Sequence, residues 1–183
     1  EVPMLGNALS YSTVGIDAKP ISIECDAAPG LWNVIMVGLP TGSVKESSHR
    51  VMAAVKNSGW DTPNKRYTIN LAPADLKKES ASLDLPIAVA LLQALKEIPK
   101  HELTRIGIVG ELSLDGNVRP VKGVLPIAIE AHRDNQDALI VPYENAEEAA
   151  IIEGLKVIPV TSLRETANYL MGKAIIPPKT MDR

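Results

Sequence analysis

The sequence predicts a mixed α/β (α+β) domain with one aliphatic core. Its first strands follow one another through short turns, whereas its later strands alternate with helices. With 183 residues, 45% hydrophobic and 22% charged, the chain has the size and composition of a single globular domain. It contains no Phe, two Trp and four Tyr, so aliphatic side chains must fill the core.

Alternation of apolar and polar residues marks two strands near the start of the chain. The pattern predicts strands over residues 8–14 and 19–27, with Ala18-Lys19-Pro20 as the turn between them. Residues 33–38 form a short continuous apolar run that ends in glycine. Such a run predicts a third strand and favours a central position in the sheet.

Two helices are predicted in the first half, separated by a strand over residues 66–71. Ser43 and Glu46 have capping-box spacing, and Gly59 can end the helix that they begin. Asp84 is placed to cap a second helix that runs from residue 85 to about residue 97. This second helix is apolar on nearly every face, so we expect it to be the most buried helix of the molecule.

The second half alternates strands and helices after one hairpin. Asp115-Gly116 is a strong signal for the turn of that hairpin. The expected elements, in order, are a strand at 106–114, its return at 117–120, a helix at 124–133, a strand at 138–141, a short helix at 145–154, a strand at 156–160, and a helix capped by Thr161 or Ser162 that ends near Leu170.

Composition limits the partners and the location. The net charge of −3 gives no overall attraction to nucleic acid, although a local basic patch is still allowed. No apolar run approaches the ~18 residues of a membrane span and no signal peptide is visible, so we expect a cytoplasmic protein without a membrane partner. The single cysteine, Cys25, excludes an intrachain disulfide and a cysteine metal cluster, and it is expected to be a buried or edge thiol in a strand.

The sequence motifs do not support a metal site or a nucleotide site. His49, His101 and His132 are far apart in sequence and lack a partner at ligand spacing. The segment 38–42 has neither the glycine pattern nor the lysine of a phosphate-binding loop. We therefore expect no metal and no cofactor in this segment.

A Ser-Lys dyad is the remaining catalytic candidate. Ser82 lies between a strand and the N-terminus of the apolar helix, where backbone N–H groups could stabilise an oxyanion, and a buried lysine could act as its base. No Gly-x-Ser-x-Gly elbow supports a Ser-His-Asp triad. Serines near helix starts more often form turns and caps, so a purely structural role stays open.

Four blocks in order resemble a known family. They are Val37-Gly-Leu-Pro40, Asn70-Leu-Ala-Pro-Ala-Asp-Leu-Lys-Lys-Glu79 with Asp84-Leu-Pro-Ile-Ala88, Gly110-Glu-Leu-Ser-Leu-Asp-Gly116, and Val141-Pro with Glu144-Asn-Ala146. Together they resemble the N-terminal domain of the ComM/YifB family, magnesium-chelatase-like AAA+ proteins linked to bacterial competence. The resemblance extends from about Leu5 to Leu170.

This resemblance implies the fold and the domain limits. The family domain is similar to the proteolytic domain of Lon proteases and to the C-terminal domain of RadA, which share the ribosomal protein S5 domain 2-like fold with a left-handed β-α-β crossover. Residues 1–172 would form the Lon-like domain. Residues 173–183 would be a linker towards an AAA+ ATPase domain outside this chain.

The resemblance also implies a broken active site. Aligned from the buried helix, Ser82 occupies the position of the Lon nucleophile. The Gly-Leu-Lys of Lon becomes Gly123-Val-Leu125, so Leu125 occupies the position of the lysine base and cannot accept a proton. Lys122, three residues earlier, is the only nearby replacement that the sequence suggests.

Three functions follow as hypotheses. The first is a non-catalytic Lon-like domain of an AAA+ motor that uses ATP and Mg²⁺ elsewhere in the protein, forms a hexameric ring and takes part in DNA uptake and recombination by branch migration, through assembly or DNA guiding. The second is a peptidase that uses Ser82, and the third is a pure oligomerisation module. The candidate contacts to DNA or a partner are Lys45, Arg50, Lys65, Arg66, Lys77, Lys78, Arg119 and Lys122, with His49 beside the first two; solvated surface charges are the simpler interpretation.

Overall fold

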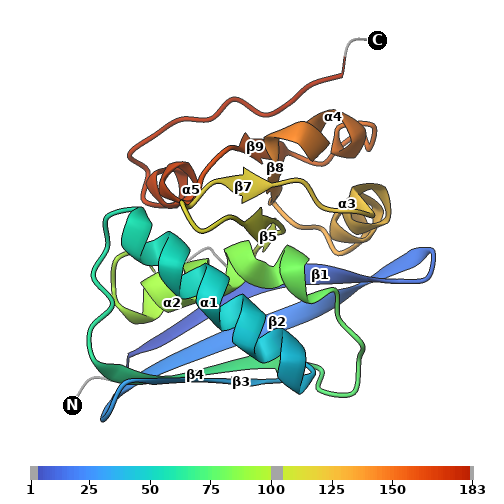
Figure 1. Cartoon of the computed structure of the whole chain (residues 1–183). Coiled ribbons are helices and arrows are strands. Elements are labelled where there is room, and N and C mark those ends of the chain that lie inside the picture. The colour runs from blue at the N-terminus through green and yellow to red at the C-terminus, as the bar shows by residue number, and fades with distance from the viewer. Residues whose placement is uncertain (1–3, 100–104, 182–183) are drawn as a thin grey trace.

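The computed structural model describes residues 4–99 and 105–181, in which a seven-stranded mixed sheet carries helices on both faces (Figure 1). The strand order is β3-β4-β2-β1-β5-β8-β9. The bounds are β1 Leu5–Val14, β2 Asp17–Pro29, β3 Asn33–Val37, β4 Lys65–Ala72, β5 Ile106–Ile108, β8 Ala138–Pro142 and β9 Val157–Val160. The predicted mixed α/β class is confirmed.

Strand direction divides the sheet into two halves. β2 pairs antiparallel with β1 and β4, and β3 runs parallel to β4 after the crossover through α1 (Thr41–Asn57). On the other side, β1, β5, β8 and β9 are all parallel. A separate hairpin of β6 (Glu111–Leu112) and β7 (Val118–Arg119) follows β5, and the predicted turn at Asp115-Gly116 joins its strands.

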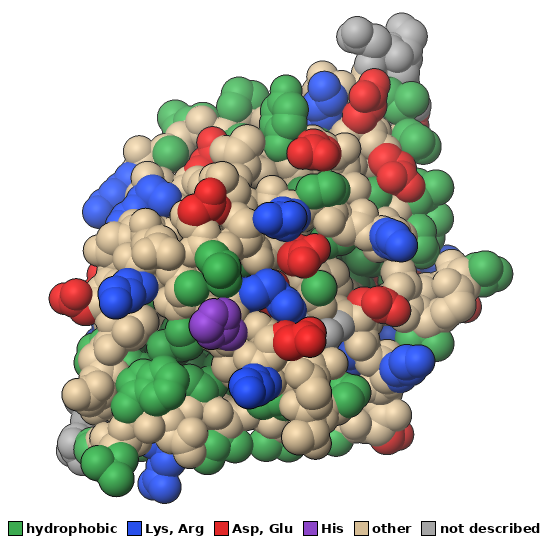
Figure 2. All heavy atoms as spheres, in the orientation of Figure 1, with side chains coloured by type: hydrophobic (Ala, Val, Ile, Leu, Met, Phe, Trp, Pro, Cys, Tyr) green, Lys and Arg blue, Asp and Glu red, His purple; other side chains and the backbone are tan. Residues whose placement is uncertain are grey.

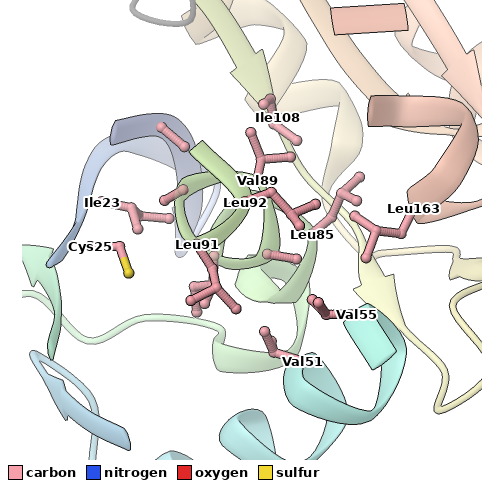
Figure 3. Close-up of a cluster of buried hydrophobic side chains, with 14 of the residues drawn as sticks. Ile23, Cys25, Val51, Val55, Leu85, Val89, Leu91, Leu92, Ile108 and Leu163 are labelled. Carbon is pink, nitrogen blue, oxygen red and sulfur yellow. The ribbon is translucent and has the colours of Figure 1, made fainter. Parts of the chain in front are cut away.

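The helix α2 (Asp84–Ala94) is the centre of the core. All of its residues are buried, as its apolar sequence predicts. It lies beside α1 over β1 and β2, and Figure 3 shows Leu85, Val89, Leu91 and Leu92 pointing towards the sheet, α1 and α5 (Leu163–Leu170). A second core lies on the opposite face of β5, β8 and β9, under α3 (Val124–Arg133) and α4 (Ala146–Ala149).

Several local predictions were wrong, and each has a physical reason. The turn between β1 and β2 lies at Gly15-Ile16, because Gly15 adopts φ 63°, and Pro20 lies inside β2 opposite Tyr11. Strand β3 is at the edge of the sheet, not the centre. Of its side chains only Met36 is buried, since a short apolar run does not say whether one face or both are covered.

The predicted helix caps failed at two of three positions. Helix α1 begins at Thr41 after Pro40 and has no side-chain cap, so Ser43 and Glu46 do not form a capping box. Asp84 does not cap α2, because its carboxylate binds tertiary partners instead. Ser162 does cap α5, accepting a hydrogen bond from the backbone N–H of Glu165.

The segment after α5 keeps contact with the domain, and the predicted role of residues 173–183 as a linker stays a prediction. The backbone N–H of Lys179 donates to the carbonyl of Val157 in β9, at 2.9 Å, and Ile176 packs against the main core. Figure 1 shows this segment running back past β9. None of the helices in the described ranges is long and apolar enough to span a membrane.

Truncation of the buried helix should destabilise the fold strongly. Leu91→Ala removes a side chain with 0% exposure and leaves a cavity, so we expect the free energy of unfolding to fall by about 2–5 kcal/mol. Urea denaturation followed by circular dichroism measures it. The control is Ile16→Ala at the β1–β2 turn, where 91% exposure predicts a change below about 0.5 kcal/mol. Equal losses in the two variants would show that α2 is not the core helix.

Candidate functional site

The serine turn forms as β4 ends and the chain enters α2. After a loop over residues 73–79, a 3₁₀ turn (Ser80–Leu83) leads directly into Asp84. The Ser82 side chain is 9% exposed, and its Oγ donates to the carbonyl oxygen of Glu79 at 2.8 Å. The hydroxyl therefore closes its own turn, which is the structural role that the sequence left open.

Gly110, between β5 and β6, holds this turn through two backbone hydrogen bonds. Its N–H donates to the carbonyl of Ser82 at 2.9 Å, and its carbonyl accepts from the N–H of Leu85 at 3.0 Å. A Cβ on Gly110 would lie 2.9 Å from Val118 Cγ1 and 3.1 Å from Leu85 Cδ2. Only glycine allows the backbone to approach the start of α2 this closely.

A buried carboxylate lies two residues after Ser82. Asp84, with 0% exposure, accepts hydrogen bonds from Arg50 Nε at 2.6 Å, from Ser47 Oγ at 3.0 Å, and from the N–H of Leu112 at 3.2 Å. Burial raises the pKa of Asp84 above its ordinary value, and Arg50, Leu112 and Ser47 oppose that rise. The hydrogen bond to Asp84 in turn raises the pKa of the Arg50 guanidinium.

Lys78 is also buried, which the sequence did not indicate. Its side chain is 6% exposed, and Nζ donates to the carbonyls of Gly38 at 2.9 Å, Leu76 at 3.0 Å and Pro73. Burial lowers the pKa of Lys78, but three carbonyl acceptors match the three donors of an ammonium. Lys78 thus ties the loop to the end of β3 and does not present its charge to a surface ligand.

Position 125, where the resemblance to Lon predicts the dyad lysine, holds no base. Leu125 is half-buried in the first turn of α3, and Lys122 is exposed just before that helix. Two hydrogen bonds with the buried side chain of Asn145 fix the backbone of Val121 beside it. Within the described residues, no lysine nitrogen is hydrogen-bonded to Ser82 Oγ.

The other predicted contact residues are spread over several elements. Lys45 and His49 are exposed on α1, Arg66 is exposed and Lys65 half-buried at the start of β4, Lys77 is exposed in the loop, and Arg119 is exposed on β7. Figure 2 shows basic and acidic side chains interspersed on the face over α1. That face carries no continuous basic area among the residues described.

Other reactive groups do not extend the site. Cys25 is buried in β2, as expected, and burial raises the pKa of its thiol to about 12. Among the residues that the structure describes, no group of three or more His, Cys, Asp or Glu side chains could hold a metal ion. His49 and His132 are exposed, and His101 lies outside the described residues.

A mixed sheet with helices on both faces, whose most buried helix follows a serine turn, is the α/β class of domain that the sequence predicts. Residues 23–145 match the family described as subunit ChlI of Mg-chelatase. YifB of Escherichia coli K12 is 41% identical over 172 residues, which cover 93% of this chain and 34% of YifB. The competence protein ComM of Haemophilus influenzae is 35% identical over 171 residues, covering 93% of this chain and 33% of ComM.

The chain therefore belongs to the magnesium-chelatase-like ChlI family, with YifB and ComM as homologues. It spans about a third of the length of these curated relatives. A Lon protease of Bacillus thuringiensis is 26% identical over 179 residues, 91% of this chain and 22% of the protease. This match confirms the predicted relation to Lon proteases.

Sequence reasoning missed the Asp84 cluster and the burial of Lys78. One signal could have revealed the cluster, because a carboxylate at the start of an otherwise apolar helix needs a buried partner. Ser47 and Arg50 lie three residues apart on α1 and so share a helix face. Nothing local distinguishes Lys78 from its exposed neighbour Lys77.

Removal of the Arg50 charge should destabilise the protein in a pH-dependent way. Arg50→Met leaves Asp84 buried without its cation, and we expect a loss of about 3 kcal/mol in unfolding free energy at pH 7. Without Arg50 the pKa of folded Asp84 rises further above the unfolded value. The folded state then favours the protonated acid, so the loss should be smallest below about pH 4, grow as pH rises towards the raised folded pKa, and level off above it.

Urea unfolding of the variant and the parent at pH 4 and pH 7 measures this difference. The control is Lys45→Met, an exposed charge on the same helix, for which we expect a change below about 0.5 kcal/mol at either pH. A loss of the same size at both pH values would show that the Arg50 charge does not act through Asp84.

Proposed function

We propose that this chain is the non-catalytic Lon-like domain of a ComM/YifB-type AAA+ ATPase related to magnesium chelatase. One observation carries the proposal: Ser82 Oγ donates to the carbonyl of Glu79 in its own turn. The leucine at position 125, where the resemblance predicts the Lon lysine, agrees with it. Without a base the serine remains a weak nucleophile, and loss of one member of a dyad removes most of the rate.

The domain would then act in assembly within a larger protein. The relatives are about three times as long as the matched region, which supports an ATPase domain outside this chain that binds ATP and Mg²⁺. The Haemophilus relative is a competence protein, which supports a role in DNA uptake and recombination. We also propose, from the resemblance to the family, that the whole protein forms a hexameric ring and is cytoplasmic.

The dispersed charges favour assembly over DNA guiding. Arg50 is engaged by Asp84 and Lys78 by three carbonyls, so two of the eight candidate contacts are already committed inside the domain. With a net charge of −3, phosphate contacts would need a concentrated basic surface. The remaining cations are distributed over α1, β4, the 73–79 loop and the β7–α3 region.

Serine-directed labelling tests the absence of hydrolytic activity. We expect a fluorophosphonate probe to give no adduct with the parent protein, because no base activates Ser82. Mass spectrometry of the parent and of Ser82→Ala checks this, with a known serine hydrolase as the positive control for the probe. An adduct on Ser82 that disappears in Ser82→Ala would make the protein a peptidase candidate.

A DNA titration tests the guiding role. We expect fluorescence anisotropy with a labelled single strand and a four-way junction to show no saturable binding by this chain below about 10⁻⁴ M protein at physiological salt. The matched variants are Lys65→Glu/Arg66→Glu and, as a control elsewhere, Lys19→Glu. Tighter binding that weakens steeply with salt and is lost only in the double variant would establish DNA contact at β4.

A further inference from the structure

The two edges of the sheet are treated differently. At β9, Pro159 cannot donate to an added strand, and the backbone N–H of Lys179 already binds Val157. At the other edge, the described part of the chain pairs β3 on one side only, with β4. Residues 33–37 contain neither proline nor charge, the usual features that prevent a further strand from pairing.

The unprotected edge also exposes apolar side chains. Ile35 and Val37 on β3 are 39% and 47% exposed, and Trp32 just before it is 52% exposed. Charged residues normally interrupt such an edge because it would otherwise pair with another chain. An apolar, uncharged edge strand can therefore pair with a strand of another chain.

A groove of about 1140 Å³ lies directly beside this edge, between the start of β3 and α1. Its apolar wall comes from Trp32, Val34, Val44 and Met52. Figure 2 shows hydrophobic side chains around a hollow at the lower left, where β3 and α1 lie in Figure 1. In a strand paired with the edge of β3, alternate side chains share a face. Those on the face that α1 covers would point into this groove.

The charge around the groove selects its occupant. Lys45, His49 and Lys56 are exposed along α1 and line the groove, whereas Glu46 is the one acidic residue among its described lining. Arg50 also lines it but is bound to Asp84. In a two-fold symmetric pair, a second copy of the chain would bring the same cationic rim to this edge, which disfavours pairing of β3 with β3.

We propose that the β3 edge and the α1 groove bind an extended acidic segment of another protein by strand addition. The backbone of this segment pairs with β3, its apolar side chains enter the groove, and its carboxylates lie near Lys45, His49 and Lys56. Backbone bonds would supply affinity, while the groove and its rim supply specificity. The inference does not depend on the proposed function.

Selection from a phage-displayed library of random dodecapeptides provides the probe. We expect the selected peptides to be net acidic with alternating apolar residues, and the best synthetic peptide to bind in the micromolar range by fluorescence anisotropy. Lys45→Glu/Lys56→Glu should weaken that binding at least tenfold. Lys19→Glu, an exposed charge on β2 that does not line the groove, should leave it unchanged.

Two further measurements separate strand addition from charge attraction. N-methylation of alternate peptide residues removes backbone donors without changing charge, and should also cost at least tenfold. Hydrogen exchange should slow at residues 33–37 when the peptide is bound.

The following results would overturn the proposal. The first is that the library yields no peptide or only basic peptides, and the second is that the double variant binds the peptide as tightly as the parent. The third is that hydrogen exchange at residues 33–37 does not change when the peptide is bound. The fourth is that the edge is already protected by self-association, with a dimer seen by sedimentation velocity in the absence of peptide. Displacement of the peptide by a single-stranded oligonucleotide with loss of the N-methylation effect would assign the rim to nucleic acid instead.

Discussion

The buried carboxylate of Asp84 is the contact on which the arrangement of this domain depends. It joins α1 through Ser47 and Arg50, α2 through its own position, and the β6 strand through the N–H of Leu112. Burying a carboxylate is unfavourable unless a cation and further donors accompany it. The site supplies all of them, so the crossing of α1 over α2 is fixed by directional bonds as well as by apolar packing.

This contact also explains why the local signals at helix starts were poor guides. Asp84 has the right type and position for a cap, but its carboxylate interacts more favourably with a guanidinium and a backbone N–H from distant parts of the chain. Propensity describes a helix in isolation, and tertiary partners override it. The Ser162 cap was predictable because the bond that forms it, from the N–H of Glu165 to the Ser162 hydroxyl, is local in sequence.

Periodicity predicted most of the strands and the most buried helix, but not the position of each strand in the sheet. The apolar run in β3 resembled a central strand because its length and composition do not report what covers each face. The position of Ser82 was accessible from the family motif, whereas the bond from its hydroxyl to Glu79 was not. That bond depends on the exact turn geometry, which Gly110 imposes from 28 residues downstream in sequence.

The two halves of the sheet differ in how completely they are covered. Every residue of β8 is buried, because Ile140 faces the main core and Leu139 and Val141 face the core under α3. In the half that contains β2, β4 and β3, α1 and α2 cover one face and α3 contacts the other face at β2, and the strands alternate buried and accessible residues. Covered faces and a covered edge thus coincide at β9, while an open face and an open edge coincide at β3. Since parallel strands buried on both faces leave no surface for a partner, the free face and the free edge of the described sheet both lie on the β3 side.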